Sequence, residues 1–342
     1  MTQRVLIWGA GAIGASVGAS LVSEGIDLTF VDSAAAHVEA MRDPAHGLRV
    51  QGGDRAFARA VVARLPSELT GSWPCILLCV KAQHTAEACH ALLPHLARDG
   101  YVVSLQNGLT ETVVAEIVGA ERTIGAFINF GADVTGPGRI AFGNRGTVAL
   151  GELDGTVTPR LEALTRTMRL FEPDAFSTDD IWSYLWGKLA YASLLFAQAA
   201  GSAGIVDCLE RPDLLPLWRA LAGEVIAVAA AEGVSPRGFN GFDPSAFAVG
   251  ADPAAAAASI KAVADFNRPS AKTHSGVWRD LAVHRRVTEV KAQFGPVVAA
   301  GARHGLACPS LRRLIALIHD IEAGDRPQHD DNLLALLEVV HA

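Results

Sequence analysis

One segment of the chain places a single charge in a long run of uncharged residues. Residues 181–200 read IWSYLWGKLAYASLLFAQAA, and Lys188 is the one charged side chain among them. Burying a lone ammonium group costs free energy unless another group pairs with it or a reaction uses it. Apolar surroundings make an ammonium release its proton more readily, so Lys188 is a candidate general acid. The alternative is a lysine whose stem lies on an apolar helix while its charge reaches solvent.

The N-terminal segment RVLIWGAGAIGASVGASLVSEG has the form of a strand, a tight turn and a helix. Its spacing G-x-G-x-x-G permits the turn, leaves room for a pyrophosphate and lets the helix approach the strand. Phosphates would meet free N–H groups at the helix N-terminus. The motif alone is weak evidence, but its place between strand and helix predicts a dinucleotide site. That site comprises Gly9, Ala10, Gly11, Ala12, Ile13 and Gly14.

The end of the second predicted strand, DLTFV, bears on which dinucleotide binds. The next residue is Asp32, and no arginine follows immediately. A carboxylate here accepts hydrogen bonds from the ribose hydroxyls of NAD and repels the 2′-phosphate of NADP. The sequence therefore favours NAD over NADP as the cofactor. The alternative is that Asp32 caps a helix beginning near Ser33.

Two more polar residues follow predicted strands. Lys81 lies in CILLCVKAQHT and Asn107 in YVVSLQNGLT. Open parallel sheets bind ligands at the carboxyl ends of their strands, so both side chains are expected to face the cofactor. Lys81 alone could be a surface lysine, and Asn107-Gly108 could be an ordinary turn. Their coincidence with the glycine motif favours binding roles.

Two kinds of structure are needed to position these residues. Buried apolar runs alternate with helical segments in the first third of the chain, which is typical of a parallel sheet. Residues 123–151 contain short strands separated by TGPG and GNRG, which predict an antiparallel hairpin added to that sheet, and a helix is expected over 159–170. Helical periodicity then takes over. We expect a dinucleotide-binding domain at 1–178 and a helical domain at 179–342.

The second domain is expected to contain only helices and loops. Its first long helix should begin at a capping residue, Thr178 or Asp179. The further expected features are a helix ending at Gly233, a loop over 235–256, two helices broken near Gly295-Pro296, and a last helix after Pro309.

Composition limits the class of protein. The 342 residues are 50% hydrophobic with a net charge of −7, and no basic block stands out, so no nucleic-acid partner is expected. Five scattered cysteines form no Cys-x-x-Cys pair, which predicts no metal site and fits a cytoplasmic location. Residues 189–206 lack charge, but polar and glycine residues interrupt them. A buried helix is favoured there over a membrane span, and no signal peptide is expected.

The order and spacing of several segments resemble the ketopantoate reductases (2-dehydropantoate 2-reductases). These segments span nearly the whole chain: GAGAIG, CVKAQHT, SLQNGL, GPGRIAFG, WGKLAYAS and THSGVWRDLAVHRRVTEVKAQFGPVVAAGARHGLACP. The resemblance implies a Rossmann-type α/β domain followed by an all-α domain like that at the C-terminus of 6-phosphogluconate dehydrogenase. It also implies an oxidoreductase acting on CH–OH, which reduces a 2-keto acid to a 2-hydroxy acid with NAD or NADP.

The resemblance assigns roles to particular residues. Lys188 matches the general acid, and Asn107 matches an asparagine beside the nicotinamide ribose and the substrate. Lys81 matches a lysine of the same cleft and could receive the substrate carboxylate. Glu289, in VTEV, matches a glutamate that contacts the cofactor and the lysine network, and Ser275 lies near the substrate-binding serine.

The residues themselves leave alternatives open for these last two. Glu289 could be a surface glutamate paired with Arg285 or Arg286, and Ser275 could be a helix N-cap. The chain also departs from the family pattern: Ala192 replaces the usual asparagine one helical turn after the lysine, and SGVWRD replaces Ser-Met-x-x-Asp.

Three functions are consistent with the sequence. The first is reduction of ketopantoate or a similar 2-keto acid. The second is a related D-2-hydroxyacid dehydrogenase with a bulkier substrate, which Ala192 and SGVWRD favour. The third is a non-catalytic NAD(P)-sensing protein, which Lys188 and Asn107 argue against. The expected partners are a small keto acid and a second copy of the chain in a homodimer, with no membrane.

Overall fold

The computed structural model of the chain describes residues 4–269 and 273–341. The chain divides into two compact units between Ile181 and Trp182. This division lies three residues beyond the boundary expected from the sequence at 178 and 179. We describe each unit by itself.

The first unit is built on an eight-stranded sheet in the order β12-β11-β8-β7-β6-β1-β2-β5. All neighbouring strands are parallel except β11 and β8, which pair antiparallel. The strands are β1 Val5–Trp8, β2 Leu28–Val31, β5 Ala63–Arg64, β6 Trp73–Leu78, β7 Leu96–Ser104, β8 Thr123–Ile128, β11 Val148–Glu152 and β12 Phe176–Ser177.

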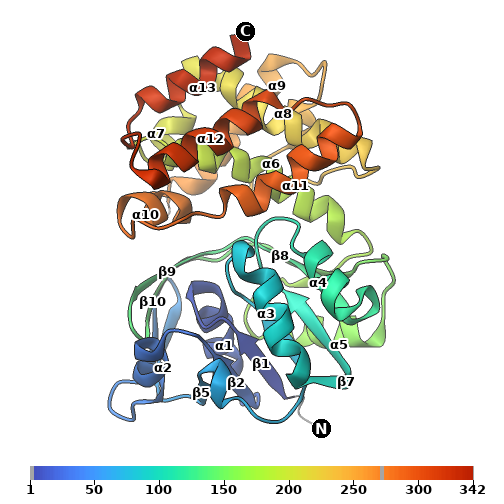
Figure 1. Ribbon diagram of the computed structural model, residues 1–342, viewed down its shortest axis with the longest axis vertical. Coiled ribbons are helices and arrows are strands. Elements are labelled where there is room, and N and C mark those ends of the chain that lie inside the picture. Colours follow the sequence, from blue (N-terminus) through green and yellow to red (C-terminus); the bar gives the residue numbers. More distant parts are fainter. Residues whose placement is uncertain (1–3, 270–272, 342) are drawn as a thin grey trace. The chain divides into compact units, whose positions relative to one another are not determined.

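Side chains alternate between the two faces of this sheet, and each face is buried under helices. Leu6 and Trp8 pack on one face with residues of α3 (Thr85–Leu92) and α4 (Glu111–Val118). Val5 and Ile7 pack on the other face with residues of the remaining helices. Those helices are α1 (Ala12–Ser23), α2 (Ala35–Arg42) and α5 (Pro159–Met168), and Figure 1 shows α3 and α4 in front of the strands. Burial on both faces explains why the strand sequences are continuously apolar.

A second sheet of four strands, in the order β4-β3-β10-β9, was not expected. It contains β3 (Leu48–Gly52), β4 (Arg55–Arg59), β9 (Gly131–Gly136) and β10 (Arg139–Asn144). The predicted antiparallel addition to the parallel sheet is confirmed for β8 and β11, but it is wrong for the β9–β10 hairpin, because β10 pairs with β3. The two strands that join it come from residues 48–59, and their buried side chains are Leu48, Val50 and Phe57.

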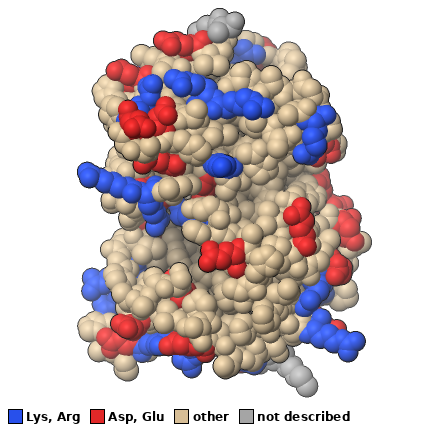
Figure 2. Space-filling model, in the orientation of Figure 1, with Lys and Arg blue, Asp and Glu red and all other residues tan. Residues whose placement is uncertain are grey.

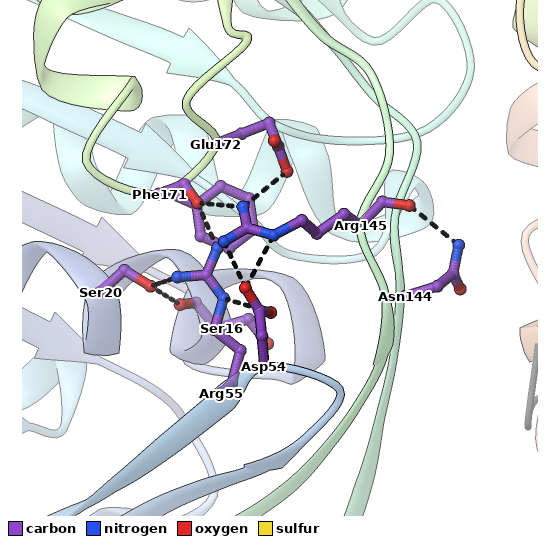
Figure 3. Close-up of polar contacts among 8 residues, drawn as sticks. All are labelled: Ser16, Ser20, Asp54, Arg55, Asn144, Arg145, Phe171 and Glu172. Carbon is purple, nitrogen blue, oxygen red and sulfur yellow. Dashed lines mark hydrogen bonds and ion pairs between the residues drawn. The ribbon is translucent and has the colours of Figure 1, made fainter.

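A cluster of polar residues links the chain around the second sheet to α1 and to the segment after α5 (Figure 3). The Arg55 guanidinium donates to Ser20 Oγ of α1 at 3.0 Å and lies over the Phe171 ring at 4.9 Å. Arg145 donates to Asp54 at 2.9 Å and to Glu172 at 3.2 Å. Helix α1 is thereby held by strand β4 as well as by its own sheet.

The second unit contains helices as the only regular elements of its described residues apart from short turns. They are α6 (Ile181–Ala199), α7 (Ile205–Leu209), α8 (Leu215–Ala231), α9 (Pro253–Asn267), α10 (Gly276–Ala282), α11 (Val290–Arg303), α12 (Pro309–Ala323) and α13 (Asp331–His341). Leu217, Trp218, Leu221 and Val225 of α8 are fully buried, so α8 lies in the core of this unit.

Two expectations for the helical domain need correction. The break expected near Gly295-Pro296 is absent, because α11 continues through Pro296; the chain leaves the helix between Ala282 and Val290 instead. Phe294 and Val297 are both fully buried, and this packing offsets the one hydrogen bond that proline cannot make. The helix starting at Pro309 is not the last, because α13 follows it. Thr178 accepts a hydrogen bond from Asp180 N at 3.1 Å just before α6.

The apolar content of the chain lies largely in these cores. Among the described residues, one helical segment, Pro212–Ala231, is long and apolar enough to cross a membrane, and 50% of it is buried inside its own unit. It is a different segment from residues 189–206, which α6 occupies only as far as Ala199. On the face shown in Figure 2, basic and acidic side chains are interspersed among uncharged areas.

Candidate functional site

The glycine-rich turn between β1 and α1 needs its three glycines for different reasons. Gly9 has φ +98°, and a Cβ there would lie 2.8 Å from Val80 N. A Cβ on Gly14 would lie 2.1 Å from Gly9 O, so this glycine lets α1 pack on the turn. A Cβ on Gly11 would meet no atom within 4 Å. Packing therefore explains Gly9 and Gly14, and open space lies in front of Gly11.

The open space lies at the N-terminus of α1. Gly11 is the N-cap residue in extended conformation, and no side chain caps the helix there. The first backbone bond within the helix is from Ala15 N to Gly11 O at 2.9 Å, and the first turn holds no acidic residue. A helix terminus with open space and no competing carboxylate in its first turn fits the pyrophosphate of a dinucleotide.

Asp32 follows β2 and supports the same turn. Its Oδ2 accepts a hydrogen bond from Ala10 N at 2.8 Å, and its Oδ1 accepts one from Ala34 N at 2.9 Å. Ala34 is the N-cap residue of α2. Asp32 accepts a hydrogen bond from Ala34 N, but no side chain caps the helix itself. A carboxylate has about four lone-pair sites, so the two remaining sites can accept ribose hydroxyls.

The polar residues after β6 and β7 lie at the same sheet edge as the glycine-rich turn. The neighbours β7, β6 and β1 are parallel, and Leu78 is in register with both Trp8 and Ser104. Lys81 and Asn107 each follow the end of their strand by three residues, and both are partly buried. The structure therefore brings them to the carboxyl edge that holds the turn.

Gln106 is a further buried residue at this edge, and the sequence analysis did not single it out. Its Nε2 donates to Val80 O and to Thr85 Oγ1, both at 2.9 Å. These bonds join the chain after β7 to the chain after β6. The only trace in the sequence is a polar residue inside SLQNGL, which cannot be separated from an ordinary turn residue.

Lys188 is partly buried in the middle of α6. Its neighbours Trp186 and Leu189 are buried, and so is Tyr191. Burial raises the pKa of Tyr191 to about 12, although a hydrogen bond from Asn267 opposes the change. Tyr191 therefore remains a neutral phenol at physiological pH. Lys188 is the one charged side chain of α6, and its role as general acid stays a prediction.

Glu289 and Ser275 lie at helix starts in the same unit. Glu289 is the N-cap residue of α11 and only 7% exposed, so the alternative of a surface glutamate is wrong. Arg286 pairs with Asp280 at 2.7 Å. Ser275 is the N-cap of α10, and its Oγ accepts a hydrogen bond from Trp278 N at 3.1 Å. The capping alternative for Ser275 is therefore confirmed.

The two groups of residues belong to different units. Gly9 to Gly14, Asp32, Lys81 and Asn107 share one edge of the first unit. Lys188 and Glu289 belong to the second unit, on α6 and at the start of α11. These two helices are in contact through the rings of Phe196 and Phe294, whose centroids lie 5.1 Å apart.

Comparison with known proteins identifies the family. The model of "Ketopantoate reductase PanE/ApbA" matches residues 5–155, and the model of its C-terminal part matches residues 180–322. The chain belongs to the ketopantoate reductase family. It is therefore an oxidoreductase of a family that uses a nicotinamide dinucleotide, and its α/β and helical domains are those of the family.

Individual relatives agree with this assignment. The 2-dehydropantoate 2-reductase of Archaeoglobus fulgidus is 28% identical over 324 residues, which are 94% of this chain and 99% of that protein. The crystal structure of 2-dehydropantoate 2-reductase from Geobacter metallireducens GS-15 is 26% identical with a TM-score of 0.78, covering 93% and 99% of the two chains. D-mandelate dehydrogenase with NADH and anilino(oxo)acetate has a TM-score of 0.81 at 20% identity, covering 94% and 99%, which shows a common fold.

Proposed function

We propose that this chain reduces a 2-keto acid to its 2-hydroxy acid and that ketopantoate is its substrate. The observation that carries the proposal is the open space at Gly11, at an uncapped helix N-terminus, in a member of the ketopantoate reductase family. Its relatives named 2-dehydropantoate 2-reductase match over almost the whole chain. The site residues retained here support the same reaction.

Each retained residue has a proposed task. Gly9 to Gly14 bind the pyrophosphate through backbone N–H groups, and Asn107 orients the nicotinamide ribose. When bound, the reduced nicotinamide supplies the hydride to the carbonyl carbon. The Lys188 ammonium stabilises the negative charge that grows on the carbonyl oxygen and then gives it a proton. Lys81 binds the substrate carboxylate, and Glu289 orients the Lys188 side chain.

The proposed cofactor is NAD(H) rather than NADP(H). Asp32 places a carboxylate beside the first turn, where it can accept ribose hydroxyls and would repel a 2′-phosphate. D-mandelate dehydrogenase, which shares this fold, was solved with NADH. Ser275 is proposed to contact the substrate through its hydroxyl proton, because its oxygen already accepts from Trp278 N.

A second candidate is a D-2-hydroxyacid dehydrogenase with a bulkier substrate. Ala192 favours it, because this small side chain stands where the family usually has an asparagine one turn after the lysine. An alanine leaves more room and offers no polar group to a hydroxylated substrate. The fold shared with D-mandelate dehydrogenase is consistent with such a pocket.

The setting of the enzyme is part of the proposal. We expect a cytoplasmic homodimer whose partner is a small-molecule keto acid, with neither nucleic acid nor membrane as a partner. The five cysteines, all free thiols, support a reducing compartment. A non-catalytic NAD(P) sensor would bind a dinucleotide tightly without turning over any keto acid.

A substrate panel tests the function. Ketopantoate, phenylglyoxylate and smaller 2-keto acids are supplied with NADH or NADPH, and oxidation is followed by the loss of nicotinamide absorbance. The proposal predicts the highest kcat/KM for ketopantoate with NADH. A preference for phenylglyoxylate would favour the second candidate. Tight dinucleotide binding with no turnover of any keto acid would refute both.

A further inference from the structure

His37, in α2, contacts the glycine-rich turn and the second sheet at once. Its side chain is buried, with Nε2 at 2.9 Å from Ala10 O and Nδ1 at 2.9 Å from Gly138 N. A backbone N–H can only donate and a carbonyl can only accept. Nδ1 must therefore be the acceptor and Nε2 must carry the proton. The two contacts fix the ring as one tautomer of the neutral form.

This ring completes a clamp on Ala10. Asp32 Oδ2 accepts from Ala10 N at 2.8 Å, and His37 Nε2 donates to Ala10 O. Ala10 lies between Gly9 and Gly11, so the orientation of these peptide groups is set by two side chains outside the motif. The glycines on both sides make the turn flexible, because the backbone dihedral angles of glycine are less restricted than those of other residues. The clamp removes that freedom where the pyrophosphate would approach.

The other contact of His37 anchors the clamp in the second sheet. Gly138, in the turn between β9 and β10, has φ +66°, and a Cβ there would lie 3.0 Å from Ala40 Cβ and 3.2 Å from Gly47 O. Its carbonyl accepts from Arg49 N at 2.8 Å. Gly138 is therefore held by β3 and α2 together, and it offers His37 a fixed N–H donor.

We propose that His37 is a positioning residue for the dinucleotide, which holds the Ala10 peptide so that the N-terminus of α1 faces the phosphates. This inference rests on the proposed function, because it takes the turn at Gly11 to be the cofactor site. It gives the second sheet a role in cofactor binding. The hairpin turn at Gly138 supplies the N–H donor that keeps His37 in the tautomer with its proton on Nε2, which donates to Ala10 O.

Two substitutions separate positioning from general stability. Gln at position 37 offers an amide oxygen and an amide N–H close together, so His37→Gln can keep both hydrogen bonds. His37→Leu keeps the bulk and removes both bonds. Met41→Ala is the matched control, since Met41 is fully buried on the same helix and contacts the core rather than the turn.

The experiment measures NADH and NADPH binding by calorimetry at pH 8, together with the thermal midpoint of each variant. We expect His37→Leu to weaken NADH binding by roughly 10-fold or more at pH 8 and to raise KM for NADH more than it lowers kcat. His37→Gln should stay within about 3-fold of wild type in its affinity for NADH, because it can keep both hydrogen bonds. Met41→Ala should lower the thermal midpoint without this loss of affinity.

The outcomes distinguish this inference from the proposed function. If wild type and His37→Leu bind NADH equally well, the inference about His37 is overturned while the proposed function stands. The same holds if Met41→Ala weakens binding as much as His37→Leu, because the effect would then be general destabilisation. If wild type binds neither dinucleotide, the proposed function is overturned and the inference falls with it.

Discussion

The substitution Gly11→Ala tests whether Gly11 is needed for cofactor binding rather than for folding. The added Cβ would meet no atom within 4 Å, and the backbone there has φ −66°, which any residue adopts. Replacing glycine in such a conformation stabilises a protein by about 0.4–1 kcal/mol through the unfolded chain. The poorer N-cap preference of alanine offsets this gain. Gly11→Ala should therefore fold with a free energy of unfolding within about 1 kcal/mol of wild type.

Binding of NADH should respond very differently. The methyl group would occupy the space through which a pyrophosphate approaches the backbone. Losing a hydrogen bond from a backbone N–H to a charged group costs about 1.5–3 kcal/mol, which corresponds to roughly 10- to 150-fold in Kd. We expect Gly11→Ala to weaken NADH binding within that range while its thermal midpoint stays close to that of wild type.

The assay is a calorimetric titration with NADH, and the thermal midpoint of each variant is measured in parallel. Gly14→Ala is the first control, because its Cβ would lie 2.1 Å from Gly9 O, and overpacking should lower the stability by about 1–3 kcal/mol. Gly276→Ala is the second control: its Cβ also meets nothing within 4 Å, but Gly276 lies on α10 in the helical unit. Unchanged NADH affinity in a stable Gly11→Ala variant would refute the placement of the pyrophosphate.

Four further outcomes are expected. Lys188→Met should lower kcat by roughly 10²- to 10⁴-fold with little change in the Kd of NADH, and strong residual turnover would remove the acid assignment. Asp32→Ala should narrow the preference for NADH over NADPH; an unchanged ratio of kcat/KM values would contradict the specificity argument. Glu224→Gln should lower the free energy of unfolding in urea by about 1–3 kcal/mol, because both oxygens of Glu224 accept backbone N–H groups of α12 at 2.8 Å; a stability equal to that of wild type would contradict it. The hydrogen bond from Ser202 N to Asp330 holds the pKa of that carboxyl below its usual value, so its stabilisation is present above the ordinary pKa of aspartate and is lost as pH falls through the lower folded value. Asp330→Asn should flatten the acid side of the stability profile, and an equally steep loss would exclude this carboxyl as its source.

The course of the parallel sheet could be predicted because its strands are buried on both faces. Continuous apolar runs such as VLIW and CILL have no polar alternation that a half-exposed strand would show. The polar residues that end such runs, Asp32, Lys81 and Asn107, could then be assigned to one edge. In contrast, β3 and β4 were missed. They are only five residues long, β4 (RAFAR) shows no polar–apolar alternation, and neither strand belongs to the parallel sheet.

In the helical unit, too, some features could be predicted from the sequence and others could not. The spacing of apolar residues predicted α6, α8 and α12, whose buried faces are long. The break at Gly295-Pro296 was wrong because a local rule about proline yields to the burial of Phe294 and Val297 on either side. Glu289 is buried although it is charged, which no local pattern of VTEV reveals.

The sequence by itself determined the fold class, the glycine-rich turn and the strand ends that carry polar side chains. These depend on short-range patterns, namely glycine spacing, apolar runs and a lone charge, each of which spans about 20 residues or fewer. Only the tertiary structure decided that Gly11 faces open space while Gly14 is packed against Gly9, and that Asp32 and His37 hold the peptide between them. Those contacts join residues up to 101 positions apart, as His37 and Gly138 are, and such pairings follow from how the elements pack rather than from any local pattern.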